Sequence, residues 1–391
     1  MSATAAAATA TTTTVALPQP DVAGSGWERL ASRALRSVER QIDGRLRPGE
    51  RVPRRVVTYR GFGNADEVFV MGRVLADDAP RTVTADASWW HNLAAAYGHL
   101  ESDEVTGARV RLSMHGAHVE AVTDDEGYYR AWLRSPEISP DVLWHAMQVT
   151  VDAPRTVSET GLALVPTAAA ELGVISDLDD TVIRTDATRL LSMLKRTLLD
   201  NAHTRLPFPG VAEFYSGLHD GTAGDAANPI FYVSSSPWNL YPVLTEFLEH
   251  QSVPMGPLML RDWGISEHGI LPTRHGEHKL GAIRQILGCY PHLPFILIGD
   301  SGQEDPEIYR QVVHEFGARI LAVYIRDVSA DAARSGAIGR LSEEVRAAGS
   351  DLLLSTDTLA SARHAAAHGW LSGGAAAAVL RAVSPSSGRP G

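Results

Sequence analysis

Short runs in which apolar and polar residues alternate fill the chain between residues 56 and 168. Turn residues separate these runs, and the stretch TDDEGYYRAWL places a tight acidic-glycine turn in front of an aromatic run. Alternation with a period of two is typical of strands that bury one face. This part of the sequence therefore predicts a small antiparallel β-sandwich domain.

The pattern of apolar and polar residues changes after Leu172, where apolar strand-like runs alternate with amphipathic helix-like runs. The strand-like runs are LGVIS, PIFYVS, PFILIGD and ARILAVYI, and the helix-like runs are PWNLYPVLTEFLEH, LGAIRQIL and PEIYRQVVHEFG. Such alternation implies right-handed βαβ crossovers and a mostly parallel sheet that is covered on both faces. We expect an α/β domain over residues 169–380, with its functional groups at the carboxyl ends of the strands.

The remaining segments show no sign of a further core. Residues 1–22 and 381–391 predict disordered tails, and the first of them lacks the basic start and leucine-rich middle of a secretory signal. Residues 23–55 predict an amphipathic helix at 27–42, with arginines on its outer face, followed by a basic linker. The apolar stripe of this helix either packs on the next domain or lies on a membrane surface.

Composition indicates a globular protein with room for two cores. The chain has 391 residues, whereas single cores rarely grow past about 250–300 residues. Its formal net charge of -11 argues against a general nucleic-acid binder. Cys289 is the single cysteine, which excludes an intramolecular disulfide and a cysteine-based metal cluster. This usage favours a reducing compartment, so we expect a cytoplasmic location, with peripheral membrane contact as an extension of it.

Polar residues that a structural role does not require follow three of the predicted strands. They are Asp177, Asp179 and Asp180 after the first, Ser234, Ser235 and Ser236 after the second, and Gly299, Asp300 and Ser301 after the third. If these strands are neighbours in the sheet, the three groups converge on one crevice.

The aspartates predict a divalent metal site. Carboxylates this close together repel one another and are costly near a core unless a cation or a proton neutralises them. A calcium loop of the EF-hand type fits poorly, because Val182 and Thr188 occupy the places of its glycine and glutamate. Asp300 has no basic neighbour in the sequence, so we expect the same cation to neutralise it. Asp305 stands before Pro306 and has two open explanations, a helix cap or a metal ligand.

The serines and a lysine predict a site for an anion. Ser236 precedes Pro237, which suits the first position of a helix, so we expect Ser236 to be its N-cap. Capping does not explain Ser234, whose hydroxyl we expect in the crevice. Lys279 lies between the serine strand and the second acidic strand, where it supplies the point charge that a phosphoryl-transfer site with magnesium needs.

In this order, DLDDT, YVSSS, Lys279 and GDSGQED resemble the four motifs of the haloacid-dehalogenase-like phosphatases. More narrowly, GVISDLDDTVIRT, FYVSSSPWNLY and LIGDSGQEDPEIY are similar to the catalytic domain of the actin-patch-protein type of phosphatidate phosphatase, a distant relative of lipins. The resemblance covers roughly residues 170 to 330, and the region before them resembles that of bacterial members. It implies a Rossmann-like doubly wound sheet with a minimal cap.

The resemblance also implies a role for each matching residue. Asp177 would be the nucleophile that forms an aspartyl-phosphate, and Asp179 the general acid and base, positioned by Thr181. Asp180 would be a second-sphere member of the triplet. Mg²⁺ would be the cofactor. Its ligands would be drawn from Asp177, Asp179, Asp300 and Asp305, and the phosphoryl group would be bound by Thr181, Ser234, Ser235 and Lys279.

A short helical stretch, RLLSMLKRTLLDN, is all that separates Thr181 from the core pattern that leads to Ser234, so we expect an open site without a separate cap domain. Such a site suits a lipid head group at a phospholipid or membrane surface. Nearby basic residues either attract anionic lipid or are solvated helix-face charges; they are Arg184, Arg189, Lys195 and Arg196.

The resemblance therefore implies magnesium-dependent dephosphorylation of phosphatidate to diacylglycerol. A phosphatase of soluble phosphomonoesters or phosphoproteins is one alternative. A non-catalytic phospholipid-binding module is another, although binding a phosphate needs neither the nucleophile nor the acid that Asp177 and Asp179 would provide. The sequence does not indicate the oligomeric state.

Overall fold

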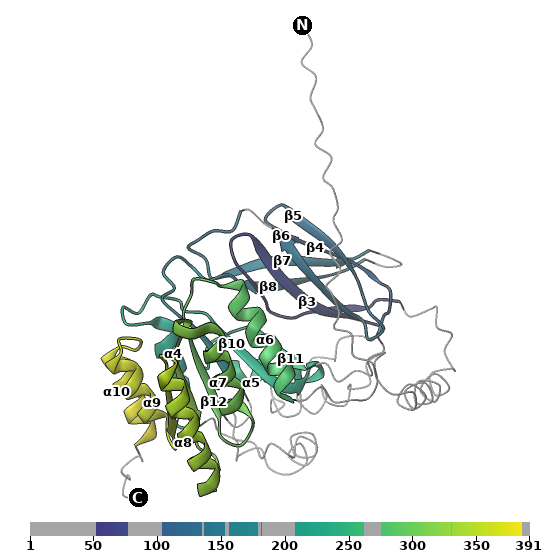
Figure 1. Ribbon diagram of the computed structural model, residues 1–391. Coiled ribbons are helices and arrows are strands. Elements are labelled where there is room, and N and C mark those ends of the chain that lie inside the picture. The colour runs from purple at the N-terminus through teal and green to yellow at the C-terminus, as the bar shows by residue number, and fades with distance from the viewer. Residues whose placement is uncertain are drawn as a thin grey trace, which may run out of the picture. The chain divides into compact units, whose positions relative to one another are not determined.

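The computed structural model describes most of the chain from residue 52 to residue 384 (Figure 1). The described residues are 52–76, 104–134, 137–152, 156–178, 181, 208–261, 275–329 and 331–384. The predicted helix at 27–42, the first tail, Asp179, Asp180 and the basic residues between 184 and 196 lie outside them.

The first part of the described chain forms a mostly antiparallel β-domain, as the alternating pattern predicted. Its strands are β1 (Arg55–Thr58), β2 (Gly61–Gly63), β3 (Glu67–Leu75), β4 (Arg109–Met114), β5 (Ala117–Val122), β6 (Tyr128–Arg134), β7 (Trp144–Val151) and β8 (Val157–Leu164). They form one sheet in the order β1-β3-β2-β8-β7-β4-β5, in which β6 also pairs with β3. The short pairing of β2 with β8 is parallel, and the other pairings are antiparallel.

The second sheet is all-parallel. Its strands are β9 (Gly173–Asp177), β10 (Ile230–Pro237), β11 (Leu258–Arg261), β12 (Phe295–Asp300), β13 (Ile320–Arg326) and β14 (Asp351–Ser355), in the order β11-β10-β9-β12-β13-β14. The strand order reverses between β9 and β12, which are neighbours although they are far apart in the chain. Ligands bind at such a switch point, outside the carboxyl ends of the strands. The α/β fold expected from the sequence is therefore confirmed.

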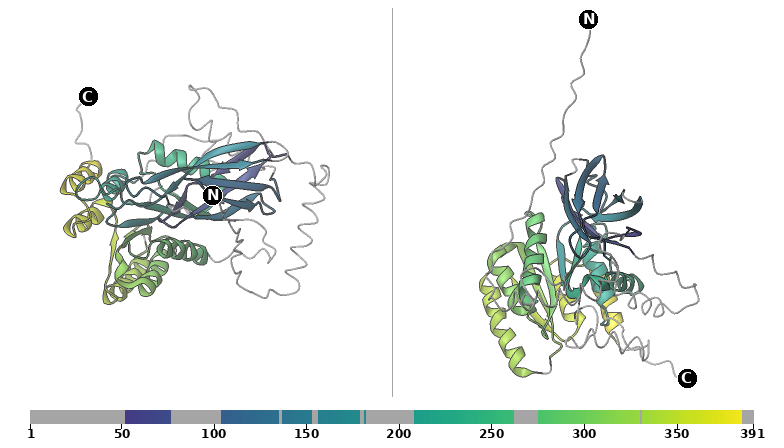
Figure 2. Two further views of the ribbon diagram at one scale, coloured as in Figure 1. Left: turned by 90° about the horizontal axis from the view of Figure 1, so that it is seen from above. Right: turned by 90° about the vertical axis from the view of Figure 1, so that its right-hand side faces the viewer.

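Helices cover both faces of this sheet (Figure 2). They are α4 (Val211–Asp220), α5 (Tyr241–His250), α6 (His275–Cys289), α7 (Asp305–Phe316), α8 (Ala332–Ala347), α9 (Thr358–Ala367) and α10 (Gly373–Val383), with 3₁₀ turns at Trp238–Leu240 and Gly317–Arg319. Val174 of β9 packs with α4, α5, α9 and α10, whereas the next residue, Ile175, packs with α6, α7 and α8. Because both faces are covered, the strands are apolar throughout instead of alternating. Among the described residues, no helix has the length and apolar character needed to cross a bilayer.

Aromatic residues of the β-domain pack into the core of the α/β part. Tyr59 stacks on Trp238, with ring centroids 4.4 Å apart, and the Arg60 amide donates a hydrogen bond to the Tyr241 hydroxyl at 2.8 Å. Both Trp238 and Tyr241 follow the serine strand β10 directly. The β-domain therefore supports the segment that comes immediately after the serines.

Candidate active site

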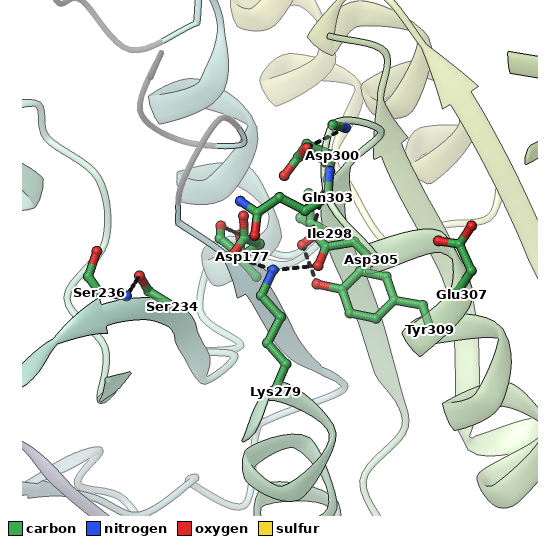
Figure 3. A network of polar contacts seen from close by, with 12 residues as sticks. Asp177, Ser234, Ser236, Lys279, Ile298, Asp300, Gln303, Asp305, Glu307 and Tyr309 are labelled. Carbon is green, nitrogen blue, oxygen red and sulfur yellow. Dashed lines mark hydrogen bonds and ion pairs between the residues drawn. The ribbon is translucent and has the colours of Figure 1, made fainter. Parts of the chain in front are cut away.

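Lys279 lies between two buried carboxylates at the carboxyl ends of the central strands (Figure 3). The first turns of α6 carry it, and its Nζ is 2.9 Å from Oδ1 of Asp177, the last residue of β9. The same ammonium forms an ion pair and hydrogen bond with Asp305. Burial opposes the charged form of Lys279, but the carboxylates of Asp177 and Asp305 outweigh burial and raise its pKa. Lys279 is therefore a fixed positive charge.

Asp300, the last residue of β12, is held by the loop that follows it. Its Oδ1 accepts hydrogen bonds from the amides of Gly302 at 2.6 Å and Gln303 at 3.1 Å. These bonds close a turn over the strand end and fix the orientation of the carboxylate. The predicted convergence of Asp177 and Asp300 is confirmed, because β9 and β12 are neighbouring strands.

Asp305 belongs to the same cluster, and the helix-cap explanation for it is wrong. It is the first residue of α7, whose N-cap is Glu304 without a side-chain cap bond. The Oδ2 atom of Asp305 instead accepts a hydrogen bond from the Asp300 amide at 3.1 Å. Gly299 makes room for this contact, because a Cβ there would lie 2.5 Å from Oδ2 of Asp305. Helix capping is predicted from neighbouring residues in the sequence. That prediction fails here because the start of α7 is buried against the end of β12.

The three aspartates fit a metal ion. Asp177, Asp300 and Asp305 are each fully buried, and each offers an oxygen within 4.8 Å of the others. Three carboxylates this close together repel one another, and burial makes that repulsion costly unless cations such as the Lys279 ammonium lie beside them. Buried carboxylate oxygens are the ligands that hard divalent cations prefer. The donor set is therefore suited to a divalent cation.

The serines lie on the strand beside Asp177. Val233 pairs with Asp177 in the register of β10 and β9, and Ser234 follows directly. The hydroxyl of Ser234 accepts a hydrogen bond from the Ser236 amide at 3.0 Å (Figure 3). The predicted cap role of Ser236 is wrong: β10 continues to Pro237, which is itself the N-cap of the 3₁₀ turn and makes no side-chain cap bond.

The remaining predicted site residues are placed only in part. Ser235 is half-buried in β10, next to Ser234. Thr181 is buried, and within the described part of the chain its hydroxyl has no hydrogen-bond partner. Asp179, the predicted acid and base that Thr181 would position, and Asp180 lie outside the described residues.

Arg334 is a residue that the sequence patterns did not indicate. It lies on α8, and its guanidinium donates to the carbonyls of Ser301 at 2.9 Å and Gln303 at 2.6 Å, and also pairs with Glu307. It thus ties α8 and α7 to the loop that holds the Asp300 carboxylate. In the sequence Arg334 looks like any solvent-facing helix residue, and its role depends on contacts with residues about 30 positions away.

Comparisons with known proteins agree with this geometry. Residues 172–327 match the family described as phosphatidate phosphatase APP1, catalytic domain. The range begins just before β9 and ends just after β13, so it includes Asp177, Ser234, Lys279, Asp300 and Asp305.

Two curated relatives match over the same part of the chain. Phosphatidate phosphatase APP1 of Saccharomyces cerevisiae is 33% identical over 156 residues, which are 40% of this chain and 26% of that protein. An uncharacterized protein of Schizosaccharomyces pombe is 30% identical over 164 residues, which are 41% of this chain and 26% of that protein. The match thus spans about a quarter of the length of these relatives.

Solved structures add nothing to this assignment. A Bacteroides ovatus GH5 xyloglucanase aligns with 80% of this chain and 68% of its own at 10% identity, but the TM-score of 0.17 is too low to indicate a shared fold. The family match, the order of the motifs and the parallel sheet agree with one another. Residues 172–327 are therefore similar to the catalytic domain of the phosphatidate phosphatase APP1 family.

Proposed function

We propose that this chain is a magnesium-dependent phosphatase whose substrate is phosphatidate and whose products are diacylglycerol and phosphate. The observation that carries the proposal is the position of the Lys279 ammonium between Asp177 and Asp305 at the switch point of the sheet. A nucleophile, a fixed cation and a metal-binding carboxylate set in one buried cluster are what phosphoryl transfer requires.

Asp177 is the proposed nucleophile. Its carboxylate attacks phosphorus, the bond to the leaving alkoxide breaks, and an aspartyl-phosphate forms. Water then attacks this acyl phosphate, which releases inorganic phosphate and restores the carboxylate. Asp179 is the proposed donor of a proton to the alkoxide and acceptor of a proton from the water. Lys279, which contacts Asp177 at 2.9 Å, orients the nucleophile and balances the charge of the phosphoryl oxygens.

The proposed metal ion is Mg²⁺. Asp177, Asp300 and Asp305 would hold it, because these three buried carboxylates lie together and offer the oxygen ligands that Mg²⁺ prefers. When bound, the ion supplies positive charge that shields the phosphoryl oxygens from the attacking carboxylate.

The substrate rests on similarity and on the expected openness of the site. The relative from Saccharomyces cerevisiae is named a phosphatidate phosphatase, and residues 172–327 of this chain match the catalytic-domain family of that name. The other proposed property is a peripheral contact with a phospholipid surface, where phosphatidate resides. Fold similarity alone supports a reaction class more strongly than it supports a substrate.

The test uses the whole chain with Mg²⁺ and two kinds of substrate. Phosphatidate in phosphatidylcholine vesicles is compared with p-nitrophenyl phosphate and a panel of soluble phosphomonoesters. We expect hydrolysis of phosphatidate to be preferred, and Asp177→Asn to lower every activity by at least about a thousandfold. Equal activity of the wild type and Asp177→Asn would refute the nucleophile. A clear preference for soluble esters without vesicle binding would refute the lipid substrate.

A further inference from the structure

A second group of potential metal ligands lies at the other end of the parallel sheet. Asp351 is the first residue of β14 and pairs with Ala322 near the start of β13, whereas Asp300 pairs with Arg326 at the end of β13. Because the strands are parallel, Asp351 lies at the amino edge of the sheet, and the proposed catalytic cluster (Asp177, Lys279, Asp300 and Asp305) lies at the carboxyl edge. The two groups are therefore separate.

Two histidines of α9 and the segment after it complete this group. His364 and His368 are four residues apart, so they lie on the same side of the helix and its C-cap. Their rings are 4.2 Å apart between centroids. The Nε2 atom of His364 is 3.5 Å from Oδ2 of Asp351. One ligand atom from each of the three residues lies within 4.8 Å of the other two.

The hydrogen bonds of the two rings favour the form that binds a metal. Nδ1 of His368 is 2.9 Å from the carbonyl oxygen of His364. A carbonyl can only accept, so this nitrogen carries the proton and Nε2 of His368 has the lone pair. Nδ1 of His364 is 3.0 Å from the Tyr324 hydroxyl, which engages this nitrogen and turns Nε2 toward Asp351. Metal-binding histidines are commonly oriented in this way through their second nitrogen.

Packing holds the exposed ring in place. The His368 ring stacks on Trp370, with centroids 4.7 Å apart and planes 21° apart, and it also contacts the ring of His364. The two ring contacts and the hydrogen bond restrict the side-chain conformations of this solvent-exposed histidine before any ion binds. If the only role of these residues were an ion pair between Asp351 and His364, the His368 ring and its fixed orientation would not be needed.

We propose that Asp351, His364 and His368 bind one Zn²⁺ ion. Two imidazole nitrogens and one carboxylate suit zinc, which takes three protein ligands and a water in a tetrahedral arrangement. Ligand bonds of about 2.0–2.2 Å place tetrahedral ligand atoms about 3.3 Å apart, so the side chains need to close slightly from their present separation. The side chains of Asp351 and His368 are exposed enough to allow that movement. The ion would join the end of α9 to the start of β14.

Zinc binding is tested on the untagged full-length chain with ZnCl₂ in the presence of excess MgCl₂, by isothermal titration calorimetry and thermal unfolding. We expect one zinc ion per chain and a rise in the unfolding temperature of a few degrees. His368→Ala should weaken zinc binding by at least about tenfold and abolish the temperature rise. His368 is exposed, so this variant should fold.

Two further variants separate this site from other zinc-binding groups. His314→Ala removes another exposed histidine, on α7, and should bind zinc like the wild type. Asp300→Asn alters the catalytic cluster and should also keep the zinc ion. Co²⁺ in place of Zn²⁺ should give the strong visible absorption of a tetrahedral site, which His368→Ala should lose. Unchanged zinc binding in His368→Ala, or loss of zinc in Asp300→Asn, would overturn the proposal.

Discussion

Lys279 shows how a single residue can serve both stability and chemistry. Its ammonium is the cation that pairs directly with Asp177 and Asp305, and all three side chains are almost completely buried. Removal of one partner from a buried ion pair typically costs about 3–5 kcal/mol, because the other charge stays buried and unpaired. The catalytic cluster should therefore depend on Lys279 for its stability as well as for phosphate binding.

Lys279→Met is expected to destabilise the protein by about 3–5 kcal/mol when metal is removed. A divalent cation bound to the same carboxylates supplies the missing positive charge, so Mg²⁺ should recover part of this loss. Urea unfolding in EDTA and in excess Mg²⁺ measures both values. Arg381→Met, on the exposed side of α10, is the control and should change neither. An equal loss in both conditions would show that the metal does not bind these carboxylates.

Gly299→Ala is expected to displace the carboxylate of Asp305. The added Cβ would meet Oδ2 of Asp305 at 2.5 Å and the Tyr309 ring at 2.8 Å, in a place where neither can retreat into solvent. Overpacking of this kind costs about 1–3 kcal/mol, and phosphatase activity should fall by at least about tenfold. Gly281→Ala on α6 is the matched control, because its Cβ would meet nothing within 4 Å. Similar activity of the two variants would contradict the proposed role of Asp305.

Most residues of the proposed catalytic cluster were predictable, and the two cap explanations that failed have one cause. Asp177, Ser234 and Asp300 were recognisable because each follows a long apolar run and lacks a structural explanation. Ser236 was interpreted as a helix cap, and a cap was one of the two explanations for Asp305, because capping can be recognised from a few neighbouring residues. Burial against a distant strand overrides such local rules, and that burial is absent from the local sequence pattern.

At the scale of elements, Arg334 connects three pieces of structure around the carboxylates that we propose bind the metal. It reaches from α8 to the loop at Ser301 and Gln303 and to Glu307 of α7. The same loop donates two amide hydrogen bonds to Asp300. Arg334 is therefore a positioning residue, which acts on the metal site through the loop.

Arg334→Met is expected to raise the Mg²⁺ concentration for half-maximal activity by about tenfold, with a smaller change in the maximal rate. The loop loses its hydrogen bonds to the guanidinium, so the carboxylate of Asp300 is less well oriented before the ion binds. Arg334→Lys should restore little, because a lysine cannot donate to several acceptors in a fixed fork. Arg340→Met, exposed on the same helix, should behave like the wild type. An unchanged Mg²⁺ dependence in Arg334→Met would refute the positioning role.

The sequence predicted the four inner strands of the parallel sheet and missed its two edge strands. The runs that form β9, β10, β12 and β13 are mostly apolar, and helix-like runs follow β10 and β12. β11 is four residues long, and β14 has only three apolar residues in five, so neither stood out. The order of the strands was not predictable either, because it depends on contacts between distant parts of the chain. Only this order brings β9 beside β12.

At the scale of the whole molecule, Cys289 lies at the contact between the β-domain and the α/β part and can serve as a probe of it. It ends α6, and the amide of Asn64 donates a hydrogen bond to its carbonyl oxygen at 3.0 Å. Its side chain is buried, and this burial raises the pKa of the thiol to about 12. The sequence indicated a single cysteine but could not show that it lies next to a strand of the first sheet.

The thiol of Cys289 is therefore expected to be almost inert in the folded protein. With a pKa of about 12, about one thiol in ten thousand is ionised at pH 8, whereas an exposed thiol with a pKa of about 8.5 is roughly one quarter ionised. Labelling by Ellman's reagent at pH 8 should be at least about a hundredfold slower in the native protein than in urea.

Asn64→Ala removes the hydrogen bond to Cys289 and should speed native labelling, because the contact opens more often. Gln148→Ala, which removes an exposed amide elsewhere in the first sheet, should leave the rate unchanged. The same slow labelling in Asn64→Ala and the wild type would show that the β-domain does not protect this end of α6.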